Sequence, residues 1–205
     1  TFLLRFWRKY QGQPQQQRLE TFISGLRQTS VRLGAVHRYL LPQAQRIGVL
    51  YGEHSSFLLE ELRHAARPLG LEIIAQDWPD PRDSRPLQHL LANSDVLLGL
   101  DDADLYNSKT AKNLLLSSYG RQMALIGPNA GFVRAGALAS TFSDQDDWLA
   151  VLDQLLDQPP ARWPRSLYPV RFGVSGNQQV ARALGLEPID PNAAAKALAE
   201  GEPTP

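Results

Sequence analysis

The fold of this chain is decided by residues 94–139, which have the sequence SDVLLGLDDADLYNSKTAKNLLLSSYGRQMALIGPNAGFVRAGALA. An apolar run at Val96–Leu100 has the length of a buried strand, and three acidic residues follow it closely. Apolar side chains then recur with helical spacing from Ala111 to Tyr119, and a second apolar run at Ala124–Ile126 ends at Gly127-Pro128-Asn129. Strand, polar loop, helix, strand and polar loop form the order of a βαβ unit.

Strands and helices alternate on both sides of this unit. The further predicted strands are Ile47–Tyr51, Leu71–Ala75, Ser140–Phe142 and Tyr168–Val174. The further predicted helices are Val31–Leu41, Phe57–Leu69, Pro86–Leu91, Asp144–Leu156 and Asn177–Leu186. Alternation of this kind predicts an α/β fold with a mainly parallel sheet and helices on both faces.

Composition excludes several classes of function. The 205 residues include 21 Lys and Arg, 21 Asp and Glu, and no Cys. Balanced charge argues against a nucleic-acid partner, because nucleic-acid-binding domains normally have a basic excess. The lack of cysteine excludes disulfides, thiolate catalysis and zinc–sulfur sites. No apolar stretch approaches the length of a bilayer span, so we predict no membrane span in this chain.

Pairs of polar residues follow two of the predicted strands. Ser55 and Ser56 follow the first, and Asn107 with Ser108 opens the helix after the third. Because the carboxyl ends of parallel strands line the ligand crevice of an open α/β sheet, these groups are expected on one edge. Each pair has two interpretations: helix N-caps that satisfy free backbone N–H groups, or an anion-binding surface suited to a carboxylate.

Acidic and aromatic residues adjoin the same loops. Asp101 and Asp102 are either a solvated acidic loop or the holder of an ammonium group, and the latter would suit a zwitterion such as an amino acid. Tyr106 and Phe132 each follow a crevice loop, where an aromatic ring either stacks on a ligand or packs into the core.

Catalytic and metal-binding interpretations have less support. The four His residues show no ligand spacing, and no G-x-S-x-G surrounds the adjacent pair His54 and Ser55. Asp101, Asp102 and Asp104 suit Mg²⁺, but Mg²⁺ sites usually need a phosphate ligand as well, and the sequence has no P-loop or dinucleotide fingerprint. We therefore predict a protein that is not an enzyme and has no cofactor or metal, the alternative being a Mg²⁺-dependent hydrolase or phosphoryl-transfer enzyme.

Four segments resemble the periplasmic substrate-binding proteins of ABC-type uptake systems, and in particular an uncharacterised proteobacterial branch with a type I periplasmic-binding fold. The resemblance covers about residues 24–186, and its most specific parts are the YNS helix start and the VRAGALAS segment. The segments are QAQRIGVLYGEHSS at 43–56, SDVLLGLDDADLYNSKTAKNLLLSSY at 94–119, ALIGPNAGFVRAGALASTFSD at 124–144 and FGVSGNQQVARALGLE at 172–187.

The resemblance implies two α/β lobes that close on a small ligand. It implies that 1–45 are a residual part of the first lobe and a linker, that 46–128 are a ligand-binding lobe, and that 129–187 cross over and return to the first lobe. Residues 188–205, rich in Pro, Ala and Glu, are predicted to be a disordered tail. Because the family's proteins are longer, most of the first lobe is expected before Thr1. Ligand contacts in the family come from loops after the strands, which here contain Ser55, Ser56, Asp101, Tyr106, Asn107, Asn129 and Phe132.

The function implied is that of a periplasmic solute-binding protein, or its C-terminal part, that binds a small polar ligand such as an amino acid or carboxylate. A membrane permease is the expected partner. The alternative is a periplasmic ligand-sensing or interaction module that reports to a membrane receptor. The acidic DDAD segment and the GPNAG loop depart from the pattern expected of the branch, so the ligand does not follow from the resemblance.

Overall fold

The computed structural model describes residues 40–143 and 172–200, together with Gly34, Asp146, Asp147, Leu149, Ala150, Asp153, Asp157 and Pro159. Its strands are β1 (Arg46–Tyr51), β2 (Glu72–Asp77), β3 (Val96–Leu98), β4 (Ala124–Ile126), β5 (Ala139–Phe142) and β6 (Gly173–Gly176). Its helices are α3 (Leu58–Ala66), the 3₁₀ turn η2 (Arg67–Leu69), α4 (Arg85–Asn93), α5 (Ser108–Tyr119), α6 (Ala130–Ala135), α8 (Gln178–Ala183) and α9 (Pro191–Glu200). None of these described helices is long and apolar enough to cross a membrane.

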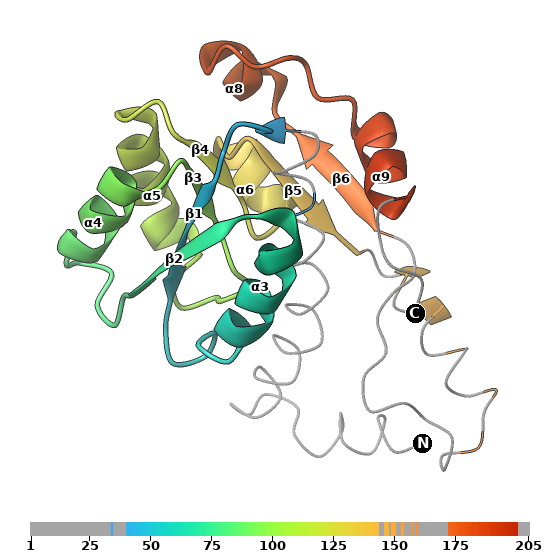
Figure 1. Cartoon of the computed structure of the whole chain (residues 1–205), viewed down its shortest axis with the longest axis horizontal. Coiled ribbons are helices and arrows are strands. Elements are labelled where there is room, and N and C mark those ends of the chain that lie inside the picture. The colour runs from blue at the N-terminus through green and yellow to red at the C-terminus, as the bar shows by residue number, and fades with distance from the viewer. Residues whose placement is uncertain are drawn as a thin grey trace.

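The strands form one six-stranded sheet in the order β2-β1-β3-β4-β5-β6 (Figure 1). Pairing is parallel from β2 through β5, and β6 runs antiparallel to β5. The predicted α/β fold with a mainly parallel sheet is therefore confirmed. The short strands β3 and β4 are buried at every position, as expected for central strands covered on both faces.

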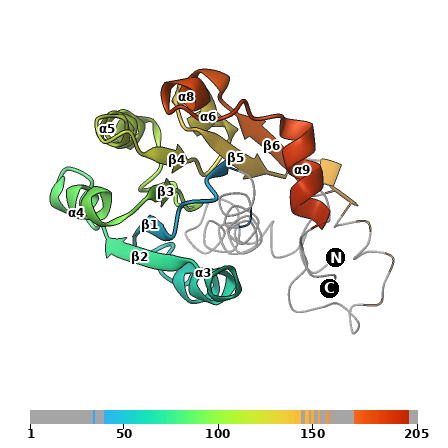
Figure 2. The same cartoon turned by 45° about the horizontal axis from the view of Figure 1, so that its top comes forward.

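Helices cover both faces of the sheet. In Figure 2, α4, α5 and α6 lie on one side of the strands, and α3 and α9 lie on the other. For α3 and for α4 to α6 this division follows from right-handed crossovers, because the connection from β1 to β2 and the later connections run across the sheet in opposite directions. The amphipathic helices α3 and α4 each direct a row of leucines into the core, for example Leu62 and Leu90.

Local sequence signals account for several element ends. Gly70, which directly follows the helix predicted at Phe57–Leu69, adopts the left-handed conformation with φ 68° at the end of η2. Trp78, placed between β2 and a proline-rich turn, is fully buried, and its indole N–H donates to the carbonyl of Asp83 over 2.7 Å. The indole thereby packs the turn onto the body of the domain.

The predicted disordered tail is wrong for most of its length. Residues 191–200 form α9, and Ile189 and Leu198 are 3% and 4% exposed. The amide side chain of Gln178 donates to the carbonyl of Ile189 and accepts from its N–H, and Asp190 accepts from the backbone N–H of Asn192. The prediction was wrong because it rested on the overall Pro, Ala and Glu content, although two apolar residues of the tail belong to the core. The alanine-rich run also favours a helix.

The predicted domain boundary between residues 128 and 129 does not interrupt the sheet. β5 pairs with β4 through Ala139 and Ile126, and β6 pairs with β5 over its whole length. Residues 129–143 and 172–176 thus extend the same sheet as residues 46–128. Four predictions lie wholly or mostly outside the described residues. They are most of the segment 1–45, most of the helix at 31–41, most of the helix at 144–156 and the first residues of the strand at 168–174.

Asp95 joins the starts of β1 and β3 at the amino edge of the sheet. One carboxylate oxygen accepts from the backbone N–H groups of Gln45 and Arg46, and the other accepts from the Arg46 guanidinium over 2.7 Å. The hydrogen bond from the Arg46 side chain is the main cause that lowers the pKa of Asp95 below its ordinary value of 3.8. The charged carboxylate therefore favours the folded state.

We predict that Asp95→Asn destabilises the protein by about 1 kcal/mol at pH 7, a modest value because the pair is partly exposed. Because the folded pKa of Asp95 is depressed, its contribution is present above the unfolded pKa of about 4 and disappears as the pH falls through the folded pKa. Urea titrations of both proteins at pH 7 and at successively lower pH measure this difference. A difference that stays constant down to about pH 2 would contradict the assignment.

Candidate functional site

The strand order changes direction at β1. The chain passes from β1 to β2 on one side and then returns to β3 on the other side of β1. β1 pairs with β2 on one side and with β3 on the other, so the loops that follow β1 and β3 lead to helices on opposite faces. A crevice outside the carboxyl ends of such neighbouring strands is the usual ligand position in open α/β sheets. In this chain, that position lies at the β1 loop, residues 52–57, and the β3 loop, residues 99–107.

Ser55 connects these two loops. Its side chain is fully buried, and its hydroxyl accepts a hydrogen bond from the backbone N–H of Gly52 over 3.0 Å. The same hydroxyl donates to Asp102 Oδ2 over 2.6 Å, 47 positions along the chain. Ser55 is therefore used in holding the loops together.

Asp102 receives every described hydrogen bond from neutral donors. It is 3% exposed, and its Oδ1 accepts from the backbone N–H groups of Asp104 and Leu105 over 3.1 and 3.3 Å. The sequence left Asp102 with two interpretations, a solvated acidic loop or, with Asp101, the holder of an ammonium group, and its burial contradicts the first. An Asp whose side chain bonds the backbone two residues ahead is a turn signal that could have identified it.

Tyr106 and Phe132 pack into the core beside the crevice. Tyr106 is 6% exposed, and its hydroxyl donates to the carbonyl of Leu50 at the end of β1 over 3.2 Å. The rings of Tyr106 and Phe132 meet edge to face with centroids 6.0 Å apart. Of the two interpretations open for these rings, the structure favours core packing, and a stacking role for either remains a prediction.

Asn107 and Asn129 are helix N-caps. Asn107 Oδ1 accepts from the backbone N–H groups of Lys109 and Thr110, and the Thr110 hydroxyl accepts from the Asn107 N–H in a reciprocal capping box. Asn129 caps α6 by accepting from the N–H of Phe132. The N-cap interpretation therefore applies to Asn107. Asn129, predicted only as a ligand contact, has the same capping role, and both amide oxygens already have partners.

The N-cap expected of Ser55 or Ser56 is wrong. α3 begins at Leu58 after Phe57, and no side chain caps it. The N–H groups of Ser55 and Ser56 both donate to the carbonyl of Gly52, so the β1 loop closes as a backbone turn before the helix starts. Ser56 is exposed, and its hydroxyl lies 3.4 Å from the carbonyl of Glu53.

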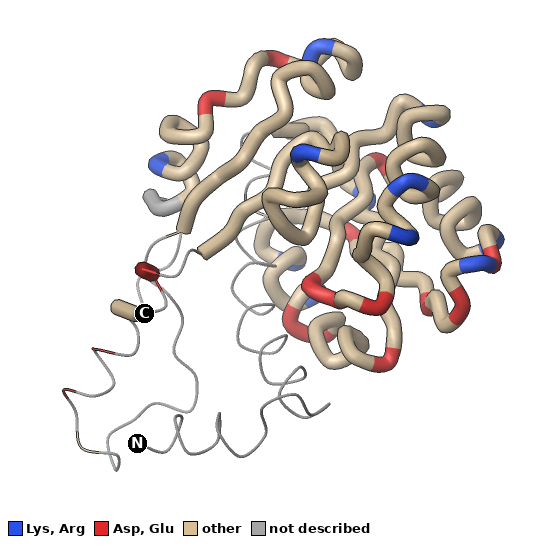
Figure 3. The backbone as a smooth tube through the Cα atoms, turned by 180° about the vertical axis from the view of Figure 1, so that it is seen from behind, with Lys and Arg blue, Asp and Glu red and all other residues tan. Residues whose placement is uncertain are grey.

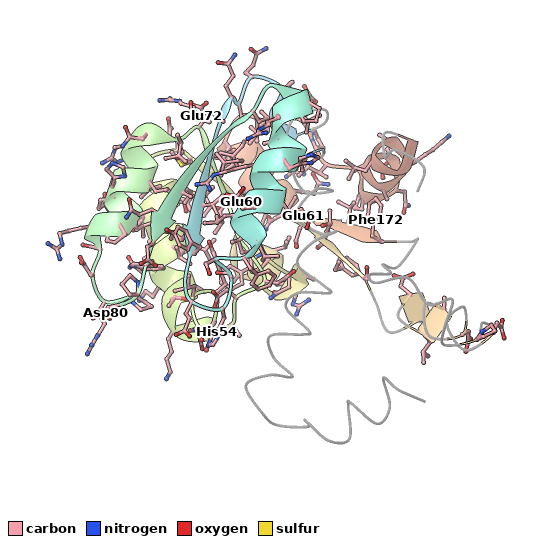
Figure 4. All side chains as sticks on the ribbon, turned by 60° about the horizontal axis from the view of Figure 1, so that its bottom comes forward. His54, Glu60, Glu61, Glu72, Asp80 and Phe172 are labelled. Atoms are coloured by element: carbon pink, nitrogen blue, oxygen red, sulfur yellow. The ribbon has the colours of Figure 1, made fainter. Side chains whose placement is uncertain are left out.

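Acidic groups dominate the accessible part of this edge. Asp101 is half-buried, Glu53 and Asp104 are exposed, and His54 Nε2 lies 3.3 Å from Asp104 Oδ2. Figure 3 shows acidic positions gathered on the loops at the lower end of the molecule. In Figure 4, which brings this end forward, His54 lies at the end of the molecule opposite Glu72, the first residue of β2.

The structure thus brings Ser55, Ser56, Asp101, Tyr106 and Asn107 to the two loops at the switch point. Asn129 and Phe132 lie one strand further along, at the start of α6 after β4, and Phe132 reaches Tyr106 through its ring. Within the described residues, no group of three or more His, Asp or Glu side chains is arranged to hold a metal ion. The ligand-binding role of the seven residues remains a prediction.

Comparison with known proteins agrees with this architecture. Neither a protein-family model nor a curated protein sequence matches the chain. Among solved structures, it is similar to the ABC domain in complex with L-Trp from Streptococcus pneumonia, with 19% identity, a TM-score of 0.63 and coverage of 82% of this chain and 59% of that one.

Two further structures have similar scores. One is the ligand-free, open structure of a substrate binding protein with adhesive properties from Clostridium difficile, with 18% identity, a TM-score of 0.61 and coverage of 76% and 55%. The other is a conserved domain protein from Vibrio cholerae, with 19% identity, a TM-score of 0.61 and coverage of 82% and 58%. The chain spans less than two thirds of the length of each. The expected likeness to ABC-type substrate-binding proteins is confirmed at the level of the fold.

The buried Ser55 hydroxyl generates a testable prediction. Ser55→Ala leaves the Gly52 N–H and one Asp102 oxygen buried without their partner, so we expect a loss of about 1–3 kcal/mol in the free energy of unfolding. Ser56→Ala, one residue along on the exposed side of the turn, should change it by less than about 0.5 kcal/mol. Denaturant titration of both variants measures the difference. Equal effects of the two substitutions would show that the Ser55 hydrogen bonds contribute no net stability.

Proposed function

We propose that this chain is the ligand-binding lobe, with part of its neighbouring lobe, of a solute-binding protein that serves an ABC-type uptake system. The observation that supports it most is the switch point between β1 and β3, whose two loops present polar groups at the edge where open α/β sheets bind ligands. The fold match to ABC-type substrate-binding proteins supports the same function. The protein acts by binding and performs no catalysis, and it works in the periplasm with a membrane permease as its partner.

The ligand is a small polar molecule such as an amino acid or a carboxylate. Asp101, Glu53 and Asp104 provide negative charge for an ammonium group on this lobe. Since the oxygens of Asn107 and Asn129 cap their own helices, the carboxylate of an amino acid would be held by other groups. Ser56, exposed at the crevice, offers a hydroxyl to the same ligand. Closure of two lobes on the ligand would shift an existing equilibrium between open and closed forms.

A thermal-shift screen tests this proposal. The full chain is heated with each of the twenty amino acids and with small carboxylates, one compound at a time and at millimolar concentration. A compound at a hundred times its Kd stabilises the folded state by about 2.7 kcal/mol, which corresponds to a rise in Tm of roughly 5–10 °C for a chain of this size. No shift with any compound would contradict the proposed ligand class.

A matched pair of variants locates the site for any compound that binds. Asp101→Asn neutralises a carboxylate of the β3 loop, and we expect it to weaken the binding of an amine-bearing compound about tenfold or more. Glu72→Gln neutralises a carboxylate at the opposite edge of the sheet and should leave the Kd unchanged (Figure 4). Isothermal titration calorimetry measures both, and equal affinities of all three proteins would place the ligand elsewhere.

A further inference from the structure

The side-chain contacts described between the β1 segment and the β3 loop include three that cross the switch point. The Ser55 hydroxyl donates to Asp102 Oδ2 over 2.6 Å, the Tyr106 hydroxyl donates to the carbonyl of Leu50, and His54 Nε2 lies 3.3 Å from Asp104. The first two are buried, whereas the third is partly exposed. The contact between Ser55 and Asp102 is the shortest of the three.

The Ser55–Asp102 contact is continuous with the backbone of both loops. On one side, Ser55 Oγ accepts from the N–H of Gly52, the first residue after β1. On the other, Asp102 Oδ1 accepts from the N–H groups of Asp104 and Leu105. A chain of hydrogen bonds thus runs from the backbone of the β1 loop, through two side chains, to the backbone of the β3 loop.

A buried carboxylate at position 102 costs more free energy than an apolar side chain of similar size would. Burial of a charged group is unfavourable unless its oxygens are fully hydrogen-bonded, and the described partners of Asp102 are one hydroxyl and two backbone N–H groups. The fold itself does not require a charge beneath a loop. Leu100 and Leu105, which flank Asp102 in the sequence, are buried apolar residues that fill the same region. The carboxylate therefore points to a role in fixing the two loops relative to each other.

We propose that Asp102, acting through Ser55, is a positioning residue of the binding crevice. It holds the β3 loop, which contains Asp101 and Asp104, in register with the β1 loop, which contains Ser56. Asp102 does not itself touch the ligand, because it lies beneath the loops and is 3% exposed. This role rests on the proposed function insofar as the crevice binds a ligand, whereas the connection between the loops belongs to the chain alone.

Amide hydrogen exchange of the ligand-free full chain tests the connection. The decisive probes are the N–H groups of Asp104 and Leu105, which bond to Asp102 and make no described hydrogen bond to Ser55. Ser55→Ala should speed the exchange of both amides about tenfold, because Asp102 loses its anchor in the other loop and the β3 loop opens more often. An effect confined to residues 52–57 would overturn the proposal.

Two control variants separate positioning from general stability. Ser56→Ala removes a neighbouring hydroxyl that reaches only Glu53 of its own loop, so exchange at Asp104 and Leu105 should not change. Ile47→Val trims a fully buried side chain of β1 and weakens the whole fold without touching either loop contact. If Ile47→Val accelerates these two amides as much as Ser55→Ala does, the contact is merely structural and the proposal fails.

Binding provides an independent measurement with the amino acid or carboxylate that gives the largest thermal shift in the wild-type screen. Ser55→Ala and Asp102→Ala should each raise the Kd about tenfold, and the double variant should raise it no further than Asp102→Ala alone, because Ser55 acts only through its hydrogen bond to Asp102. Additive effects, or an unchanged Kd in Ser55→Ala, would overturn the positioning role. If no compound binds the wild-type chain, the proposed function fails while the exchange experiment still decides whether Ser55 and Asp102 position the loops.

Discussion

Parallel pairing of β1 with strands on both of its sides is the constraint on which the rest of this structure depends. A parallel neighbour is reached only through a crossover, and right-handed crossovers in opposite directions place α3 on one face and α4 on the other. The chain must therefore separate the two loops that leave β1 and β3 at their carboxyl ends. Side-chain contacts such as the one from Ser55 to Asp102 then connect these loops, and the central strands beneath them are buried at every position.

Different kinds of contact stabilise the amino and the carboxyl ends of strands β1 and β3. At the amino edge, Asp95 is partly exposed and bonds Arg46, so its charge is matched by a cation at the surface. At the carboxyl edge, Asp102 is buried and is satisfied by a hydroxyl and by backbone N–H groups. A surface ion pair tolerates motion and solvent, whereas a buried carboxylate requires its donors to stay in place. The carboxyl edge, where a ligand would bind, is thus the more tightly specified of the two.

Hydrophobic patterning in the sequence was sufficient for most of the fold. The run Ala124–Ile126 coincides with β4, and the helical spacing after Asn107 coincides with α5, because in each case one period dominates the segment. The prediction of a disordered tail at 188–205 was wrong for the opposite reason, since no single period dominates that segment. Its two core residues, Ile189 and Leu198, are too far apart and too diluted by alanine to stand out, and only tertiary contact with the body shows which face of α9 is buried.

The candidate site was harder to predict from the sequence, because the type of a residue does not determine whether its side chain points into the protein or toward the solvent. The neighbours Asp101 and Asp102 are chemically identical, yet one is half-buried near the surface and the other lies under the loop bonded to a serine 47 positions away. Likewise, the N–H groups of Ser55 and Ser56 both donate to the carbonyl of Gly52, yet the side chain of Ser55 is buried and that of Ser56 is exposed. Long-range hydrogen bonds of this kind leave no periodic pattern. The sequence could therefore place the loops that follow β1 and β3 at the same end of the sheet, while which of their side chains are buried and which are exposed follows only from the fold.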